Sequence, residues 1–136
     1  MPANIANLRA GLATQLQTIS GLRVYEYIPG TPNFPCAVIR LNRVGYDSTL
    51  SRGSDEIDFV ITMAVGRADD RVAQTSIETY LAGTGSLSVK TAIENDPTLG
   101  GSALNTRVQE ARNIATEDRG DGLSFLTVDF AVTVIA

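Results

Sequence analysis

The sequence predicts an α+β fold: an antiparallel or mixed sheet of about four to five strands, with an N-terminal helix and a central helix packed on one face. Within residues 56–65 every second residue is apolar, which is typical of a strand with one buried face. These apolar residues are Ile57, Phe59, Ile61, Met63 and Val65. Residues 69–81 then change to helical spacing. The strands group together instead of alternating strictly with helices, which favours α+β.

The first half of the chain predicts a helix, two strands and the loop between them. Residues 4–20 carry an apolar stripe at helical spacing, and Gly21 is a C-terminal stop signal. The stripe consists of Ile5, Leu8, Leu12, Leu16 and Ile19. Residues 22–27 alternate as a first strand. The prolines within residues 29–35 cannot supply a sheet's amide donors, so we expect a loop there, followed by a second strand over residues 37–42.

A polar segment over residues 44–54 joins the second strand to the third and is longer than a tight hairpin needs. The central helix begins at Asp69 and Asp70, whose carboxylates suit the positive end of a helix, and Gly83 follows its last turn. We therefore expect one long strand that leads almost directly into a helix lying across the sheet.

The second half predicts a short helix and two strands. Ser86 or Ser88 is the expected N-cap of the short helix, and Asp96-Pro97 ends it. Residues 105–113 predict a polar strand, and residues 115–122 a charged loop. The clearest strand comes last, with one apolar face made of Leu126, Val128, Phe130, Val132 and Val134.

Composition indicates a single domain over residues 1–136. The net charge of −4 and the pI of about 4.7 offer no basic field for nucleic acid, so we expect no sequence-specific binding to it. No apolar run is long enough to span a membrane, and residues 1–4 do not resemble a signal peptide. Cys36 is the only cysteine and reads as a small buried hydrophobe. The expectation is an intracellular product, at least when synthesised.

The residue inventory argues against most enzymes. The chain has no histidine and one cysteine, which removes the usual nucleophile pairs and thiolate zinc sites. Asp69 and Asp70 can be read as a carboxylate pair, but a helix cap with a first-turn acid is the favoured interpretation. Residues 117–122 lack the spacing of a calcium loop, and residues 83–86 lack the lysine of a phosphate loop. We predict no catalytic, cofactor or metal site.

Long loops on a small scaffold are common binding elements. The 44–54 loop carries Tyr46 and Arg52 and is flanked by Arg43, residue types that are enriched at contact hot spots. A connector without a binding role is an equal alternative from these residues alone.

The order of segments resembles a known family. The helix ending in residues 21–25 leads into the proline loop and the strand Phe34-Pro35-Cys36-Ala37-Val38-Ile39. The long strand, the central helix, the turn Asp96-Pro97-Thr98-Leu99-Gly100-Gly101, and Gly120-Asp121-Gly122 before the last strand follow in turn. Over essentially the whole chain this is similar to the tail terminator (tail completion) and neck proteins of long-tailed bacteriophages.

The resemblance implies a virion protein, made in the host cytoplasm, whose copies form a ring that is typically six-fold. Such a ring caps the tail tube, ends its polymerisation and presents the surface that joins the head. It implies contacts with the tube protein and the head-completion or connector protein, and no cofactor. On this basis we expect partner contacts at Arg43, Tyr46, Arg52, Arg107 and Gln109. A head-completion protein, a tail-tube subunit, a non-viral α+β binding module and a carboxylate-based hydrolase are the alternatives.

Overall fold

A computed structural model describes residues 5–19, 22–25, 36–46, 55–67, 71–85, 88–101, 103–118 and 124–136. Within these residues the helical elements are α1 (Ile5–Leu16), α2 (Arg71–Leu81), α3 (Val89–Glu94) and the 3₁₀ turn η1 (Leu99–Gly101). The strands in the same part of the chain are β1 (Arg23–Tyr25), β2 (Cys36–Gly45), β3 (Glu56–Arg67), β4 (Asn105–Asp118) and β5 (Ser124–Ile135).

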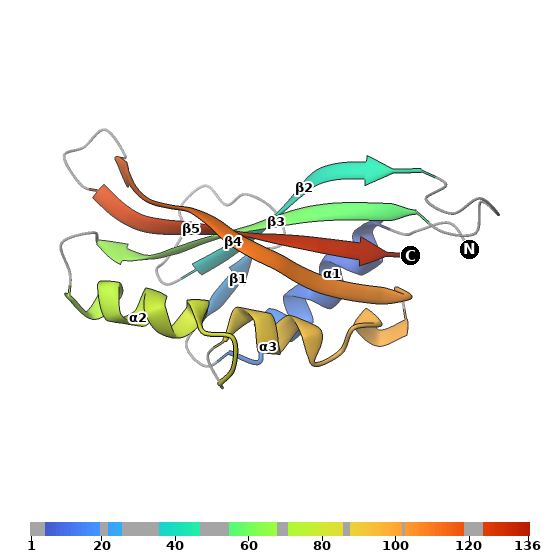
Figure 1. Ribbon diagram of the computed structural model, residues 1–136, viewed down its shortest axis with the longest axis horizontal. Coiled ribbons are helices and arrows are strands. Elements are labelled where there is room, and N and C mark those ends of the chain that lie inside the picture. Colours follow the sequence, from blue (N-terminus) through green and yellow to red (C-terminus); the bar gives the residue numbers. More distant parts are fainter. Residues whose placement is uncertain are drawn as a thin grey trace.

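The described strands form one mixed sheet with the order β1-β2-β3-β5-β4. β1 pairs with the first residues of β2 in parallel, whereas the pairs β2–β3, β3–β5 and β5–β4 are antiparallel. Two hairpin-like pairs, β2–β3 and β4–β5, are therefore joined along the β3–β5 seam at the centre of the sheet (Figure 1).

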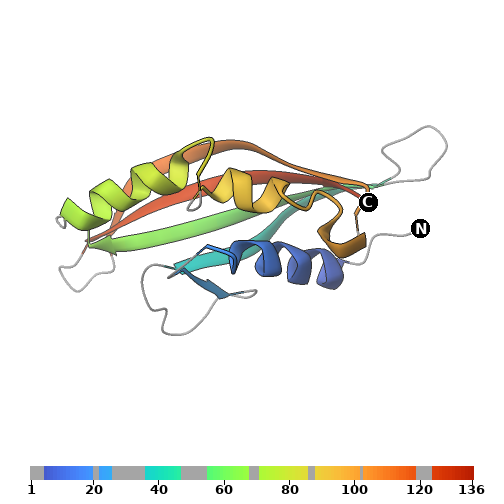
Figure 2. The ribbon, with the colours of Figure 1, turned by 90° about the horizontal axis from the view of Figure 1, so that it is seen from below.

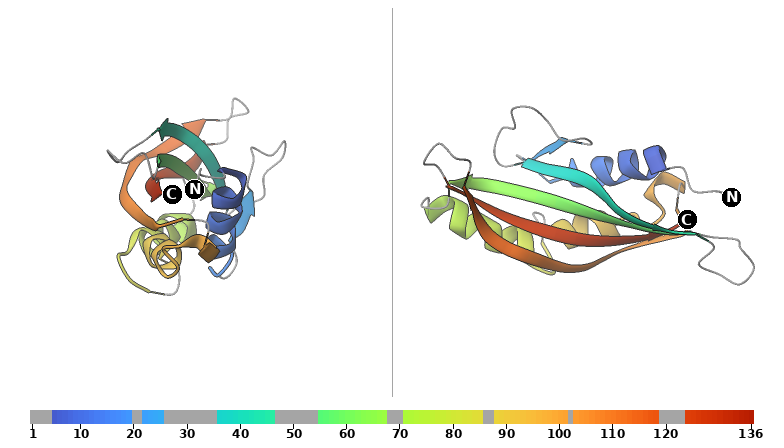
Figure 3. Two further views of the ribbon diagram at one scale, coloured as in Figure 1. Left: turned by 90° about the vertical axis from the view of Figure 1, so that its right-hand side faces the viewer. Right: turned by 90° about the horizontal axis from the view of Figure 1, so that it is seen from above.

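The helices cover one face of this sheet, so the predicted α+β class is confirmed. Figure 2 shows α1, α2 and α3 in front of the strands, with α1 near the β1–β2 side and α2 and α3 near β4 and β5. The right-hand view of Figure 3 shows the strands from the opposite side, with α2 and α3 behind them and α1 visible beyond β2. We call the side that faces away from the helices the outer face.

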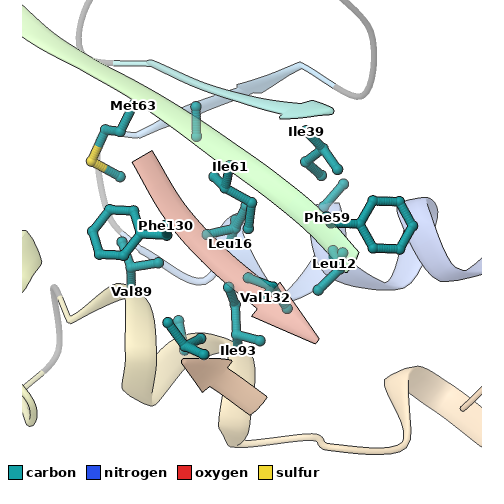
Figure 4. Packing of buried hydrophobic residues seen from close by; sticks show 14 of the residues in the cluster. Leu12, Leu16, Ile39, Phe59, Ile61, Met63, Val89, Ile93, Phe130 and Val132 are labelled. Carbon is teal, nitrogen blue, oxygen red and sulfur yellow. The ribbon is translucent and has the colours of Figure 1, made fainter. Parts of the chain in front are cut away.

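The core lies between the sheet and the helices. The predicted apolar face of β3 is buried throughout, and so are Val128, Phe130, Val132 and Val134 of β5. Figure 4 shows side chains from these strands meeting residues of α1 and α3, among them Leu12, Leu16, Val89 and Ile93. Cys36 is buried as expected.

Several predicted boundaries were wrong. β4 continues to Asp118 through the start of the expected 115–122 loop, because its end pairs with β5 as far as Ser124. β2 continues through Val44 and Gly45, which pair with Ile57 and Glu56, so the expected 44–54 loop starts later.

α1 ends at Leu16 rather than at residue 20, because the backbone tightens into i→i+3 turns through Ile19. Ile19 nevertheless stays buried, as the apolar stripe predicted. The stop signal Gly21, the proline loop at 29–35 and the acidic pair Asp69-Asp70 lie outside the described residues.

Candidate assembly surface

The pairing register of β2, β3, β5 and β4 aligns residues of the outer face in rows that cross the sheet. One row crosses the sheet through Arg43, Asp58, Thr133 and Arg107. The next consists of Arg40, Val60, Ala131 and Glu110, and a third of Val38, Thr62, Asp129 and Arg112. Most of these side chains are polar because successive residues of a strand point to opposite faces and the other face is the core.

The first row is held together by charge-assisted contacts. Arg43 Nε donates to Asp58 Oδ2 at 2.8 Å, and Thr133 Oγ1 donates to Asp58 Oδ1 at 3.1 Å. A second nitrogen of Arg43 lies 3.4 Å from a carboxylate oxygen of Glu56. The hydrogen bond to Asp58 and the charges of Asp58 and Glu56 raise the pKa of Arg43. Arg43 is thus fixed across the β2–β3 pair as a permanent cation.

Asp129 is the equivalent centre of the third row. Its Oδ1 accepts from Thr62 Oγ1 at 2.8 Å and its Oδ2 from Asn113 Nδ2 at 3.0 Å. Arg40 Nη2 lies 3.9 Å from Oδ1. Asn113 has a φ of 55°, a left-handed conformation that asparagine tolerates better than most residues. One carboxylate therefore connects β2, β3 and β4 from its position on β5.

The structure places the predicted contact residues that it describes at separate positions on the sheet. Arg43 and Arg107 lie in the same row but at its two ends, on β2 and β4. Gln109 is exposed at a bulge of β4, between Val108 and Glu110. Tyr46 follows the end of β2 and is 76% exposed. Arg52 lies outside the described residues.

Exposed large apolar side chains occur on or next to β2 and β4, the two strands that bound these rows. Leu41 and Tyr46 lie on or directly after β2, and Leu104 and Ile114 lie just before or within β4. Leu104 and Ile114 are 67% and 54% exposed. Neither residue was singled out from the sequence. Ile114 directly follows the polar segment 105–113, and an isoleucine in such a setting could have indicated an exposed apolar side chain.

A further residue that the sequence did not reveal is Glu94 at the end of α3. Its Oε2 accepts a hydrogen bond of 3.0 Å from the backbone N–H of Val108, and Lys90 Nζ lies 2.6 Å from the same oxygen. Burial alone raises the pKa of Glu94, but hydrogen bonds from Lys90 and Val108, with the charges of Lys90 and Arg107, outweigh it and leave this pKa lowered.

In the part of the chain that the structure describes, no cluster of acidic or cysteine side chains has the form of a metal site. No helix among the described residues is both long and apolar enough to cross a membrane. No protein-family model matches the chain, and a search of curated proteins found no similar sequence.

Proposed function

We propose that this chain is a structural assembly subunit that acts as a tail terminator of a long-tailed bacteriophage. Copies of it form a ring on the finished end of the tail tube, stop further polymerisation and provide the surface for the head. The proposal combines the segment order of the sequence with one structural observation, the presence of exposed apolar residues at two different sides of the sheet.

That observation supports a ring for a reason of symmetry. Leu41 and Tyr46 belong to the β2 side of the sheet, whereas Leu104 and Ile114 belong to the β4 side. A contact between two different surfaces is heterologous, and copies joined in this way form a closed ring or an open filament. A specific contact of this kind buries about 800 Å² on each partner.

The remaining partners follow from the same proposal. One face of the ring contacts the tube protein and the other the head-completion or connector protein, in the virion neck. Tyr46, just after the end of β2, has an exposed aromatic side chain of a type that is enriched at contact hot spots, and we place it in such a contact.

Electron microscopy of particles made without this gene product tests the function. Filled heads beside abnormally long, unattached tails are the expected result. Tails of normal length beside unjoined heads would move the assignment to a head-completion protein. Normal particles would contradict both assignments.

A variant tests the contact residues separately. Replacing Tyr46 and Arg52 with alanine should abolish tail joining while the chain still folds, as judged by circular dichroism. Thr79→Ala is the matched control, because Thr79 is exposed on α2 and its hydroxyl donates to the Thr75 carbonyl within that helix. Normal joining by the double variant would exclude this segment from the contact.

A further inference from the structure

The side of β2 is an open sheet edge over much of its length. β1 pairs only with Cys36, Ala37 and Val38, and the rest of β2, from Ile39 to Gly45, has no second strand beside it among the described residues. Leu41 lies within this stretch and is 41% exposed. Unpaired N–H and C=O groups along such an edge can hydrogen-bond to a strand of another molecule.

The side of β4 is a second edge, but only part of it is available. The N–H of Val108 is already bonded to Glu94, so α3 occupies the first part of the edge. Beyond Val108, the side chains from Gln109 to Ile114 are all exposed. The bulges at Gln109 and between Arg112 and Ala115 make this stretch irregular, which favours a specific partner over indiscriminate strand addition.

The strand directions fit the two edges to each other. β2 is antiparallel to β3, β3 to β5 and β5 to β4, so β4 runs opposite to β2. A neighbouring copy rotated about an axis along the strands keeps its orientation and brings its β2 beside β4 in an antiparallel sense. The sheet of one copy then continues into the next without a reversal, as the repeat of a ring requires.

Charge favours this arrangement over a two-fold pairing of β2 with itself. Arg40 and Arg43 lie on the outer face, whereas Leu41 between them pairs with Phe59 and has the register of the core face. A two-fold pair of β2 strands centred between Arg40 and Arg43 would bring arginines of both copies together. Like charges placed opposite each other across strands are destabilising. β4 instead carries exposed charges of both signs, with Glu110 in the same row as Arg40 and Arg112 at 3.1 Å from Glu110.

We propose that neighbouring copies join by pairing the Ile39–Gly45 edge of β2 in one copy with the Gln109–Ile114 stretch of β4 in the next. This junction rests on the proposed ring function and specifies how the ring is built. Leu41 of one copy packs near Ala111 and Ile114 of its neighbour, and Glu110 lies beside the arginines of β2.

Cysteine cross-linking tests the junction in the full chain. In a Cys36→Ala background, which removes the native thiol, Leu41→Cys and Ala111→Cys are prepared as separate variants, one with a size tag. The two are mixed at a concentration where sedimentation detects oligomers, or at the highest soluble concentration, and treated with a short bis-maleimide. We expect a cross-linked pair of mixed size in the mixture and only background in each variant alone.

The double variant, Leu41→Cys with Ala111→Cys, should give a ladder of multimers that stops at the ring number. Thr79→Cys mixed with Leu41→Cys is the control for random collisions and should give background only. Cross-linking of Leu41→Cys alone would show a two-fold pair and overturn the junction, as would background in every mixture.

The junction and the function fail in different ways. Failure of cross-linking together with long, unattached tails in the absence of the gene product would reject the junction and leave the terminator function standing. A mixed cross-link with no effect of the gene on any particle would keep the junction and reject the phage role.

Discussion

Glu94 Oε2 accepts a 3.0 Å hydrogen bond from the backbone N–H of Val108, so the last residue of α3 ties that helix to an outer strand of the sheet. Glu94→Ala should lower the free energy of unfolding by about 1–3 kcal/mol, because a backbone donor loses its charged acceptor. Glu94→Gln keeps an acceptor and should lose less. Chemical denaturation measures all three proteins, and equal losses in both variants would contradict this role of the hydrogen bond.

Glu94 also predicts a pH dependence. Hydrogen bonds from Lys90 and Val108 outweigh the opposing effect of burial and lower its pKa below the ordinary value of 4.5. A lowered carboxyl pKa means that the contribution to stability is complete above the pKa of the unfolded chain and disappears as pH falls through the folded one. The difference in unfolding free energy between the native chain and Glu94→Gln should therefore shrink below about pH 4.5. A difference that grows on acidification would contradict the sign.

Gly11 allows α1 to approach the turn η1 closely. A Cβ at this position would lie 2.7 Å from Leu99 Cβ and 3.1 Å from Leu99 O, and Leu99 is buried with a φ of 49°. Gly11→Ala should lower the melting temperature, although alanine is the better helix former by about 1 kcal/mol. Gly83→Ala is the control, because no atom lies within 4 Å of its added Cβ. A rise in melting temperature for Gly11→Ala would show that η1 moves aside without cost.

Asp129 should contribute more to the free energy of unfolding than other charged residues on the outer face. Asp129→Ala removes the acceptor of both Thr62 and Asn113, and we expect a loss of about 1–3 kcal/mol in unfolding free energy. Glu110→Ala removes a surface ion pair with Arg112 and should cost less than about 1 kcal/mol. Urea denaturation of the two variants makes the comparison, and a Glu110→Ala loss as large as that of Asp129→Ala would contradict it.

The strands that sequence reasoning located best are those without a bulge at their centre. β3 keeps strict alternation from Ile57 to Val65, so its core face could be predicted residue by residue. β4 contains two bulges, and each extra residue resets the alternation. For that reason the alternation did not predict that β4 continues to Asp118.

The candidate surface was predictable only in part. Residue type suggested Arg43 and the family resemblance suggested Arg107, but their shared row depends on the register of four strands, which no local pattern contains. The contact between Glu94 and Val108 joins a helix end to a strand through tertiary packing, so spacing in the chain gives no sign of it.

The β3–β5 seam has a consequence for how the chain folds. It pairs Glu56 with Ile135, which are more than half the chain length apart, whereas the β4–β5 pair closes over a short connection. Closing a long loop costs entropy before any contact repays it, so the β4–β5 hairpin should form early and the seam should set the rate. Shortening Ile61 to valine should then mainly slow refolding. The same loss of stability at Val108 should also slow refolding, because the β4–β5 hairpin is already paired when the seam closes.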